Sequence, residues 1–304
     1  MSRIKLTDEQ FNALCTTRVA EPEAIFDAYA RRTRRDRLTR DGVMFIVAAD
    51  HTARGMVGLG ADPYAMADRR SMLGRLLTAL DNPRVDGVLA SADIMDDLML
   101  LGALEGKVAV GTMNRGGLAG TTWGLDDRFT AFDTAHLVSQ RLDAGKMLLR
   151  LHDTEAGTAP TLHACAQAVQ ELTDAKTMAM VEPIPYTTNS AGAHAWHHDD
   201  ERLVRAVGVA AGLGASSAYN WLKIQATDAI EQVARVTNQP LLLLGGDPGP
   251  DPQRTFALWQ LGLAQPTVRG LVVGRALLYP ADGDVEGAVA RAAHLVEAAA
   301  VGRK

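Results

Sequence analysis

The chain has 304 residues, of which 47% are hydrophobic, and its formal net charge is -5 at pH 7. A chain of this length and composition can bury a large core, and we interpret residues 1–304 as one globular domain. The negative balance argues against a general nucleic-acid or anionic-membrane surface, and no apolar run approaches the roughly eighteen residues of a membrane span.

Two further features indicate a reduced, cytoplasmic protein. Residues 1–7 lack the apolar core of a signal peptide. Cys15 and Cys165 are the only cysteines, and they match neither a metal-binding spacing nor a CxxC motif. We therefore expect a cytoplasmic protein with no membrane or nucleic-acid partner.

The first 41 residues predict a helical extension that precedes the first strand. Thr7-Asp-Glu-Gln10 has the pattern of a capping box that opens one helix, and residues 21–35 predict a second, with Pro22 tolerated in its first turn. Arginine recurs six times between Arg31 and Arg40, which we interpret as a solvated helix end and turn. If a barrel follows, we expect these helices to close its bottom.

Eight short apolar runs follow, and each predicts a buried strand. Segments with helical periodicity separate them, at 65–80, 128–142, 161–172, 200–213, 229–236 and 253–263. The strand-like runs are 43–49, 85–90, 107–111, 146–151, 177–181, 218–224, 241–244 and 268–273.

This alternation favours a (β/α)8 TIM barrel with extra N-terminal helices. Strands that alternate with helices imply parallel βαβ crossovers, and near-continuous apolar strands fit a sheet that is covered on both faces. Eight units in about 260 residues match the barrel in size. The competing fold is an open doubly wound sheet, but the first strand is followed by no GxGxxG fingerprint and the chain has no P-loop.

Four ionisable residues lie on or just after separate strands, where a barrel places its functional groups. They are Asp50, Lys146, Glu182 and Lys223. Three of them have a structural alternative: Asp50 as a turn former, Lys146 in an interior ion pair, and Lys223 at a strand edge with its head in water. Glu182 interrupts an apolar run, so its carboxylate either meets a cation or is protonated. Together they can converge on one pocket.

Such a pocket suits carbonyl chemistry. A lysine in apolar surroundings lowers its pKa, and a neutral amine can attack a carbonyl to form a Schiff base. A second ammonium, Lys146, would lower the pKa of Lys223 further, and the carboxylates could move protons. The sequence thus predicts Lys223 as the nucleophile of a retro-aldol or related reaction.

Four motifs resemble the class I aldolases related to tagatose-bisphosphate aldolase, and the resemblance spans residues 43–280. They are Asp50-His51 with Arg54-Gly55, Ala144-Gly-Lys-Met-Leu-Leu149, Val181-Glu-Pro-Ile-Pro-Tyr186 and Trp221-Leu-Lys-Ile224. The resemblance implies a Schiff base on Lys223, with Asp50, Lys146 and Glu182 assisting charge stabilisation and proton transfer. It fits deoxyribose-phosphate aldolase less well, because residues 241–247 contain no lysine.

The chain also resembles the aldolase-type proteins of actinobacterial myo-inositol catabolism. That resemblance implies cleavage of 6-phospho-5-dehydro-2-deoxygluconate to dihydroxyacetone phosphate and malonate semialdehyde. We expect a homo-oligomer that needs no cofactor.

Glycines at the ends of the last two strands predict a phosphate site. Gly245 and Gly246 follow one strand and Gly274 and Arg275 the other, where barrels often bind phosphate. Exposed backbone N–H groups and a bidentate guanidinium suit that ligand, although the glycines could simply shape turns. Arg115, after the third strand, could meet another acidic group of the substrate.

The segment 193–200 contains three histidines and two aspartates and invites a metal interpretation. Adjacent His197 and His198 cannot easily face one ion, and Asp199 and Asp200 are well placed to begin a helix. We therefore expect a mobile loop over the active site and no metal.

Two other functions remain open from sequence. A thiolase-like acyl transferase acting on a phosphorylated diketone could use the same lysine covalently. A non-catalytic barrel could serve as a binding protein.

Overall fold

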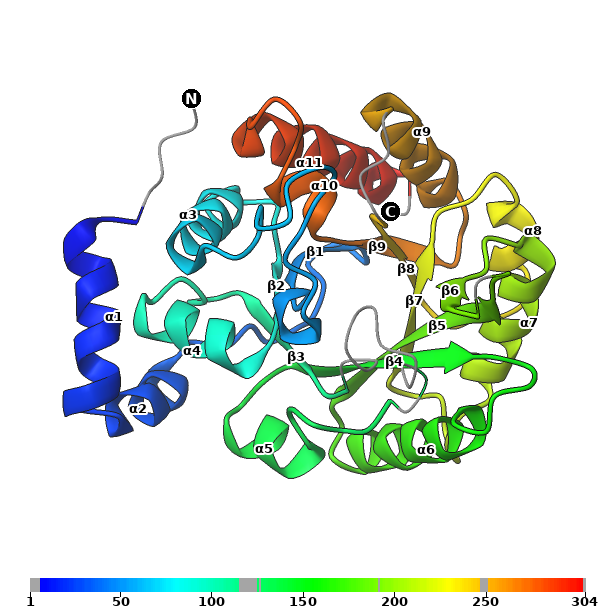
Figure 1. Cartoon of the computed structure of the whole chain (residues 1–304), viewed down its shortest axis with the longest axis horizontal. Helices are drawn as coiled ribbons and strands as arrows, with labels where there is room; N and C mark the ends of the chain where they lie inside the picture. The colour runs from blue at the N-terminus through cyan, green and yellow to red at the C-terminus, as the bar shows by residue number, and fades with distance from the viewer. Residues whose placement is uncertain (1–5, 115–124, 126, 191, 247–250, 303–304) are drawn as a thin grey trace.

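In the computed structural model, eight parallel strands close into a barrel (Figure 1). The structure describes residues 6–114, 125, 127–190, 192–246 and 251–302. The strand order is β4-β3-β2-β1-β9-β8-β7-β5, and β5 pairs with β4 to close the ring. The predicted TIM barrel and its eight strands are confirmed. The strands are β1 Met44–Ala49, β2 Gly87–Ala90, β3 Val108–Thr112, β4 Ala144–Leu151, β5 Met178–Thr188, β7 Asn220–Gln225, β8 Leu241–Leu244 and β9 Val268–Val273.

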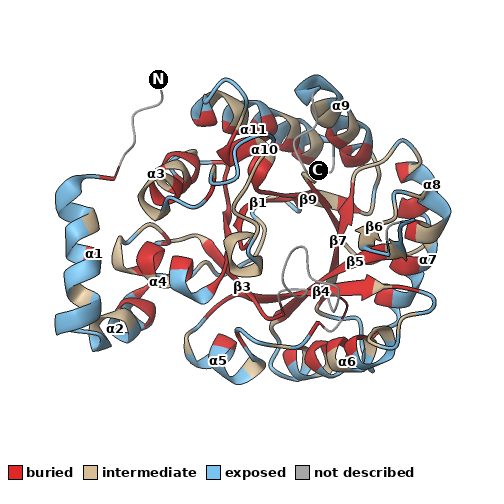
Figure 2. Cartoon of the chain, viewed as in Figure 1, coloured by how far each residue is buried: buried red, intermediate tan, exposed pale blue. Residues whose placement is uncertain are grey.

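Strands β1, β2 and β3 are buried at every position and almost wholly apolar, as expected for a sheet with both faces covered (Figure 2). One set of side chains, including Ile46, Met180 and Leu242, fills the lower lumen. The alternate positions, including Val47, Val181 and Leu243, pack outward against the helices. A charged residue on a lumen-facing position therefore has no water beneath it.

Helices follow the strands and cover the barrel. They are η1 Thr52–Arg54, α3 Arg69–Leu80, α4 Ala92–Leu100, α5 Thr134–Ser139, α6 Thr158–Asp174, α7 Asp200–Ala211, α8 Ile230–Ala234, α9 Pro252–Leu263, α10 Arg275–Leu278 and α11 Val285–Val301. Aspartate side chains at Asp68, Asp133, Asp199, Asp251 and Asp284 accept backbone N–H groups and fix where five of them begin. None of the described helices combines the length and apolarity needed to cross a bilayer.

The two predicted N-terminal helices form but do not close the barrel. Helix α1 (Asp8–Ala20) has the expected capping box, and α2 is Glu23–Arg31. Both lie outside α4 (Figure 1), where Arg18 donates to Asp97 at 2.7 Å and the hydroxyl of Tyr29 donates to Asp96 at 2.9 Å. The expectation that the helices plug the barrel was wrong, because α2 packs against α4 and the bonds of Arg18 and Tyr29 hold both helices beside it.

The segment after α2 reaches the bottom of the barrel instead. Arg32 is 2% exposed, and its Nη1 lies 3.1 Å from Asp143 just before β4. Arg35 lies 2.8 Å from Asp86 just before β2, and Leu38 packs on the apolar lumen. The interpretation of the arginine run as solvated was therefore wrong for Arg32 and Arg35, whose charges meet buried carboxylates.

Part of the histidine-rich segment forms a strand, where the sequence predicted a loop. Strand β6 (His194–Trp196) pairs antiparallel with the end of β5, so that Thr188 lies opposite His194 and Tyr186 opposite Trp196. This hairpin stands beside the barrel mouth (Figure 1). As predicted, Asp199 then caps α7.

Candidate active site

The four ionisable residues predicted from the strands meet in the barrel lumen. Nζ of Lys146 lies 2.7 Å from Oε2 of Glu182 and 3.2 Å from Oδ2 of Asp50. Nζ of Lys223 lies 3.2 Å from the same Glu182 oxygen. All four residues are buried, with exposed fractions between 1% and 6%. The structure thus brings together one residue from each of four strand segments.

Strand alternation places them there. In β4 and β5, Lys146 pairs with Met180 and Leu148 with Glu182, so Lys146 and Glu182 alternate with side chains that point outward. On β7, Leu222 and Ile224 pack toward the helices, which leaves Lys223 on the lumen side. Because the floor below is apolar, these charges are satisfied by one another.

Both carboxyl groups are held ionised. Burial opposes the charge of Glu182, but Lys146 and Lys223 outweigh it and lower the pKa of Glu182 to about 2. The pKa of Asp50 is also lowered, because Lys146 overcomes the effect of burial. Thr112 donates a further hydrogen bond to Asp50 at 3.3 Å. Asp50 and Glu182 are therefore acceptors at neutral pH.

The two lysines shift in opposite directions. Burial alone would lower the pKa of Lys146, but its two carboxylate partners raise it. Burial lowers the pKa of Lys223, and the nearby Lys146 adds to that effect, while Glu182 opposes it. Compared with an ordinary lysine, the site thus favours the ammonium form of Lys146 and the neutral amine form of Lys223.

Further polar side chains, to which the sequence assigned no role, lie on or just after the same strands. Burial lowers the pKa of His51 to about 3, which keeps its imidazole neutral. Arg150 contacts Asp127 through Nε at 2.8 Å and lies over the ring of Tyr186 at 5.0 Å. Arg150 and Tyr186 fall on the same strand faces as Lys146 and Glu182, so period-two alternation could have identified them.

The residues predicted to bind phosphate occupy the ends of β8 and β9. Arg275 begins α10 and is 9% exposed, and burial together with the charge of Arg54 lowers its pKa to about 10. Arg115 lies outside the described residues.

The three predicted glycines each have a local structural reason. A Cβ on Gly274 would lie 2.5 Å from the carbonyl oxygen of Ala48, and one on Gly245 would lie 2.6 Å from Val273. Gly246 has φ 64°, a left-handed conformation that favours glycine. Close packing and turn geometry account for these residues, and phosphate binding by their N–H groups stays a prediction.

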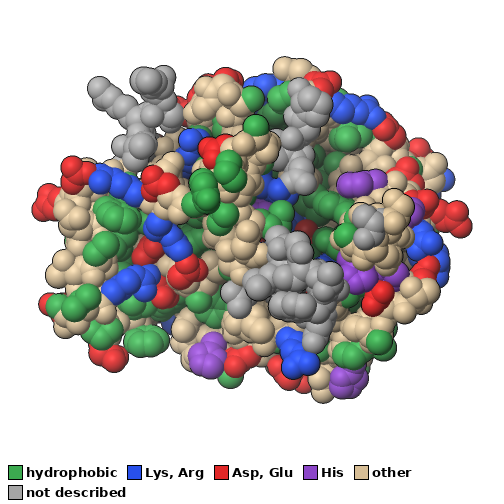
Figure 3. Space-filling view, viewed as in Figure 1, with side chains coloured by type: hydrophobic (Ala, Val, Ile, Leu, Met, Phe, Trp, Pro, Cys, Tyr) green, Lys and Arg blue, Asp and Glu red, His purple; other side chains and the backbone are tan. Residues whose placement is uncertain are grey.

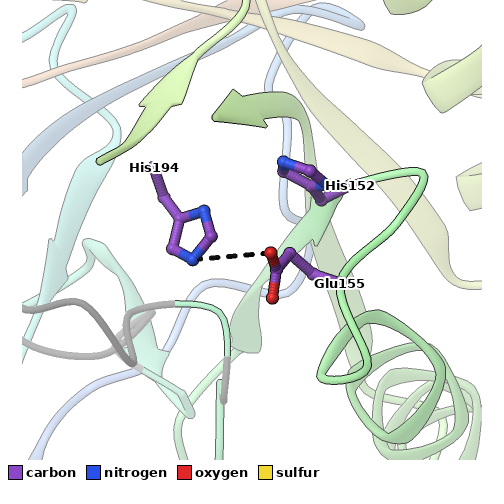
Figure 4. Close-up of side chains that lie close together, drawn as sticks. All are labelled: His152, Glu155 and His194. Atoms are coloured by element: carbon purple, nitrogen blue, oxygen red, sulfur yellow. Dashed lines mark ion pairs between the residues drawn. The ribbon is translucent and has the colours of Figure 1, made fainter. Parts of the chain in front are cut away.

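A separate group at the rim could hold a metal ion. His152, Glu155 and His194 each place one ligand atom within 4.8 Å of the others (Figure 4). Of the three histidines in segment 193–200, His194 belongs to this group, whereas His197 and His198 do not. His152 follows β4 directly, and that position at a strand end was the signal available in the sequence.

The chain is similar to known proteins in both sequence and structure. The model of the Cgl0159-like family matches residues 42–293. The crystal structure of Cgl0159 from Corynebacterium glutamicum is 44% identical in sequence and has a TM-score of 0.93, with 97% of this chain and 99% of that chain covered. No curated protein matches the chain.

More distant structures share the fold. An archaeal fructose 1,6-bisphosphate aldolase is 17% identical with a TM-score of 0.64, over 90% of this chain and 99% of that chain. An archaeal fructose-1,6-bisphosphate aldolase whose catalytic lysine is covalently bound to the carbinolamine intermediate of its substrate is 18% identical, with a TM-score of 0.66 and the same coverage. At these identities the likeness establishes the barrel alone.

Proposed function

The chain belongs to the Cgl0159-like family, and we propose that it is a class I aldolase that cleaves a phosphorylated keto sugar or sugar acid through a Schiff base on Lys223. The observation that carries the proposal is a buried lysine with a lowered pKa, 3.2 Å from a carboxylate that is held ionised. An amine in this setting is a nucleophile, and its neighbour can accept and return protons.

The proposed reaction uses only these groups and water. Nζ of Lys223 attacks the ketone carbon to give a carbinolamine, which loses water to form an iminium ion. A hydroxyl group on the carbon β to the iminium carbon then loses its proton, the C–C bond breaks, and an aldehyde leaves. The electron pair moves to nitrogen as an enamine, which takes up a proton before water releases the second product and restores the lysine. Glu182 and Asp50 are the candidate proton acceptors.

The charges of the site favour this intermediate. With Lys223 neutral, the ammonium of Lys146 faces two carboxylates, and the cluster of four carries one net negative charge. Conversion of Lys223 to a cationic iminium removes that imbalance. In a buried site, the two carboxylates therefore stabilise the cation that the reaction creates.

Fold relatives and the barrel rim add support. In one archaeal fructose-1,6-bisphosphate aldolase with the same kind of barrel, the catalytic lysine is covalently bound to a carbinolamine intermediate. Arg275, at the end of β9, provides a cation for a phosphate group, with Arg54 near enough to affect its pKa. These features favour a phosphorylated ketone.

A finer proposal concerns the substrate. The sequence resemblance to aldolase-type proteins of myo-inositol catabolism favours 6-phospho-5-dehydro-2-deoxygluconate, which would yield dihydroxyacetone phosphate and malonate semialdehyde. This substrate has an anionic group at each end, so a second cation besides Arg275 is required. Arg54 is our candidate for this second cation.

Product analysis tests the proposal. Purified protein is incubated with 6-phospho-5-dehydro-2-deoxygluconate and with fructose 1,6-bisphosphate, and the products are identified by NMR with and without coenzyme A. We expect dihydroxyacetone phosphate and an aldehyde, at a rate that coenzyme A does not change. An acyl thioester formed only with coenzyme A would instead indicate acyl transfer.

A further inference from the structure

Three side chains at the barrel rim form a cluster outside the lysine site. His152 directly follows β4, Glu155 lies in the loop before α6, and His194 lies on β6 (Figure 4). Two imidazoles and one carboxylate are the ligand set of many zinc sites that keep positions open for water or another ligand. Figure 3 shows histidine side chains gathered on this side of the mouth.

The cluster has ligand geometry. One ligand atom from each side chain lies within 4.8 Å of the others, and Nε2 of His194 is 3.9 Å from Oε1 of Glu155. Ligands bound to zinc at about 2.0–2.2 Å in a tetrahedral arrangement are roughly 3.3 Å apart. Small side-chain rotations would therefore close the set around an ion, and Glu155, with a side chain that is 37% exposed, has room for one.

His152 is held firmly in position. His152 is largely buried. Its backbone N–H donates to Oγ1 of Thr158 at 3.2 Å, and the same hydroxyl donates to the backbone carbonyl of His152 at 2.9 Å. Oγ1 of Thr154 lies 3.4 Å from Nδ1. The backbone N–H of Thr154 donates to the same Nδ1 at 3.3 Å, which places the proton of the neutral ring on Nε2. For Nε2 to bind an ion, this proton has to move to Nδ1, where the hydroxyl of Thr154 can accept it as an outer hydrogen-bond partner.

The hydroxyl of Thr188 links the two histidine rings. Its hydroxyl lies 3.0 Å from Nε2 of His152 and 3.4 Å from Nδ1 of His194. In the absence of an ion this hydroxyl satisfies the ring nitrogens. An ion bound by Nε2 of both rings replaces the hydrogen bond between Thr188 and His152. The contact between Thr188 and Nδ1 of His194 can remain as an outer hydrogen bond, and water can fill the other positions of the ion.

We propose that His152, Glu155 and His194 bind one divalent transition-metal ion of the zinc type, which fastens the β5–β6 hairpin to the end of β4 at the barrel mouth. Imidazole and carboxylate ligands suit zinc, and the same set would accept Co²⁺ as a spectroscopic probe. The site is separate from Lys223 and its partners, so this inference does not rest on the proposed aldolase function.

Calorimetric titration of the chelator-treated full-length protein with ZnCl2 tests the site. We expect one ion per chain, with affinity reduced at least about tenfold in His194→Ala and in Glu155→Gln. The matched control is His198→Ala, which removes a histidine four residues from His194. It should leave the affinity unchanged.

Cobalt provides the second measurement. Co²⁺ added to the wild-type protein should give a visible absorption spectrum of low-coordinate cobalt that Glu155→Gln alters and His194→Ala abolishes. Circular dichroism of the variants verifies that they are folded. If the wild-type protein fails to bind one ion, or if both variants bind zinc as tightly as the His198→Ala control, the site is wrong.

Discussion

Lys146 and Lys223 contact the same oxygen atom, Oε2 of Glu182, at 2.7 and 3.2 Å. They are not equivalent, because Lys146 also has Asp50 as a partner at 3.2 Å. Two carboxylates raise the pKa of Lys146, whereas burial and the neighbouring ammonium lower that of Lys223. This asymmetry favours the ammonium form of Lys146, and it supports the proposal that Lys223 is the nucleophile.

The first prediction concerns the pH dependence of amine reactivity. The rate of adduct formation with dihydroxyacetone phosphate and cyanoborohydride should rise with pH as Lys223 loses its proton. Because the pKa of Lys223 is lowered, the rate should reach its plateau at a lower pH than for an ordinary lysine, whose pKa is about 10.4. Glu182→Gln removes an anion that favours the ammonium and should move the midpoint to lower pH. Lys146→Met removes a cation and should move it to higher pH. Shifts in the same direction would refute the assignment.

The second prediction concerns phosphate. Arg275→Ala should weaken the binding of phosphorylated substrates by about 1.5–3 kcal/mol, the range for a hydrogen bond to a charged group. Trapping of unphosphorylated dihydroxyacetone at high concentration should persist. Arg254→Ala, at an exposed position on α9, is the control. Equal losses for both ligands would mean that Arg275 supports the barrel and does not bind phosphate.

The third prediction concerns the bottom of the barrel. Asp143→Asn leaves the buried guanidinium of Arg32 without its anionic partner, and the free energy of unfolding should fall by roughly 3–5 kcal/mol. Asp8→Asn breaks the ion pair of an exposed aspartate with Arg70 and should cost less than about 1 kcal/mol. Urea unfolding measures the free energy of unfolding of both variants. Similar decreases in the two would show that the buried ion pair contributes no more to stability than the exposed one.

The fourth prediction compares two glycines. Gly274→Ala forces a Cβ to within 2.5 Å of the Ala48 carbonyl oxygen and 2.9 Å of His51, so it should destabilise the fold by about 1–3 kcal/mol. Gly208→Ala, inside α7, meets Val236 at an ordinary 3.6 Å. It should stabilise the protein by roughly 0.5–1 kcal/mol. Thermal unfolding of the two variants should give shifts of opposite sign.

Much of the fold and the centre of the site could be predicted because buried parallel strands are apolar along their whole length. A lysine or glutamate inside such a strand stands out, and parallel strands carry it to a shared lumen. Lys146, Glu182 and Lys223 are therefore predictable from the sequence alone.

Other features depend on long-range pairing that the local pattern does not contain. Arg32 looks solvated in sequence, and only its meeting with Asp143 across the barrel bottom makes it buried. His194 lies beside His152 because β6 folds back and pairs with β5. The short sequence of β6 does not indicate which strand it pairs with or in which register.

Intact-mass analysis after borohydride trapping with dihydroxyacetone phosphate tests the central claim most directly. The wild-type chain should gain one reduced ketone adduct, which peptide mapping should place on Lys223. Lys223→Met should gain none, while Lys176→Met, which removes a lysine between α6 and β5, should react as the wild type does. An adduct of equal yield in Lys223→Met, or one mapped to Lys146 in the wild-type chain, would contradict the account.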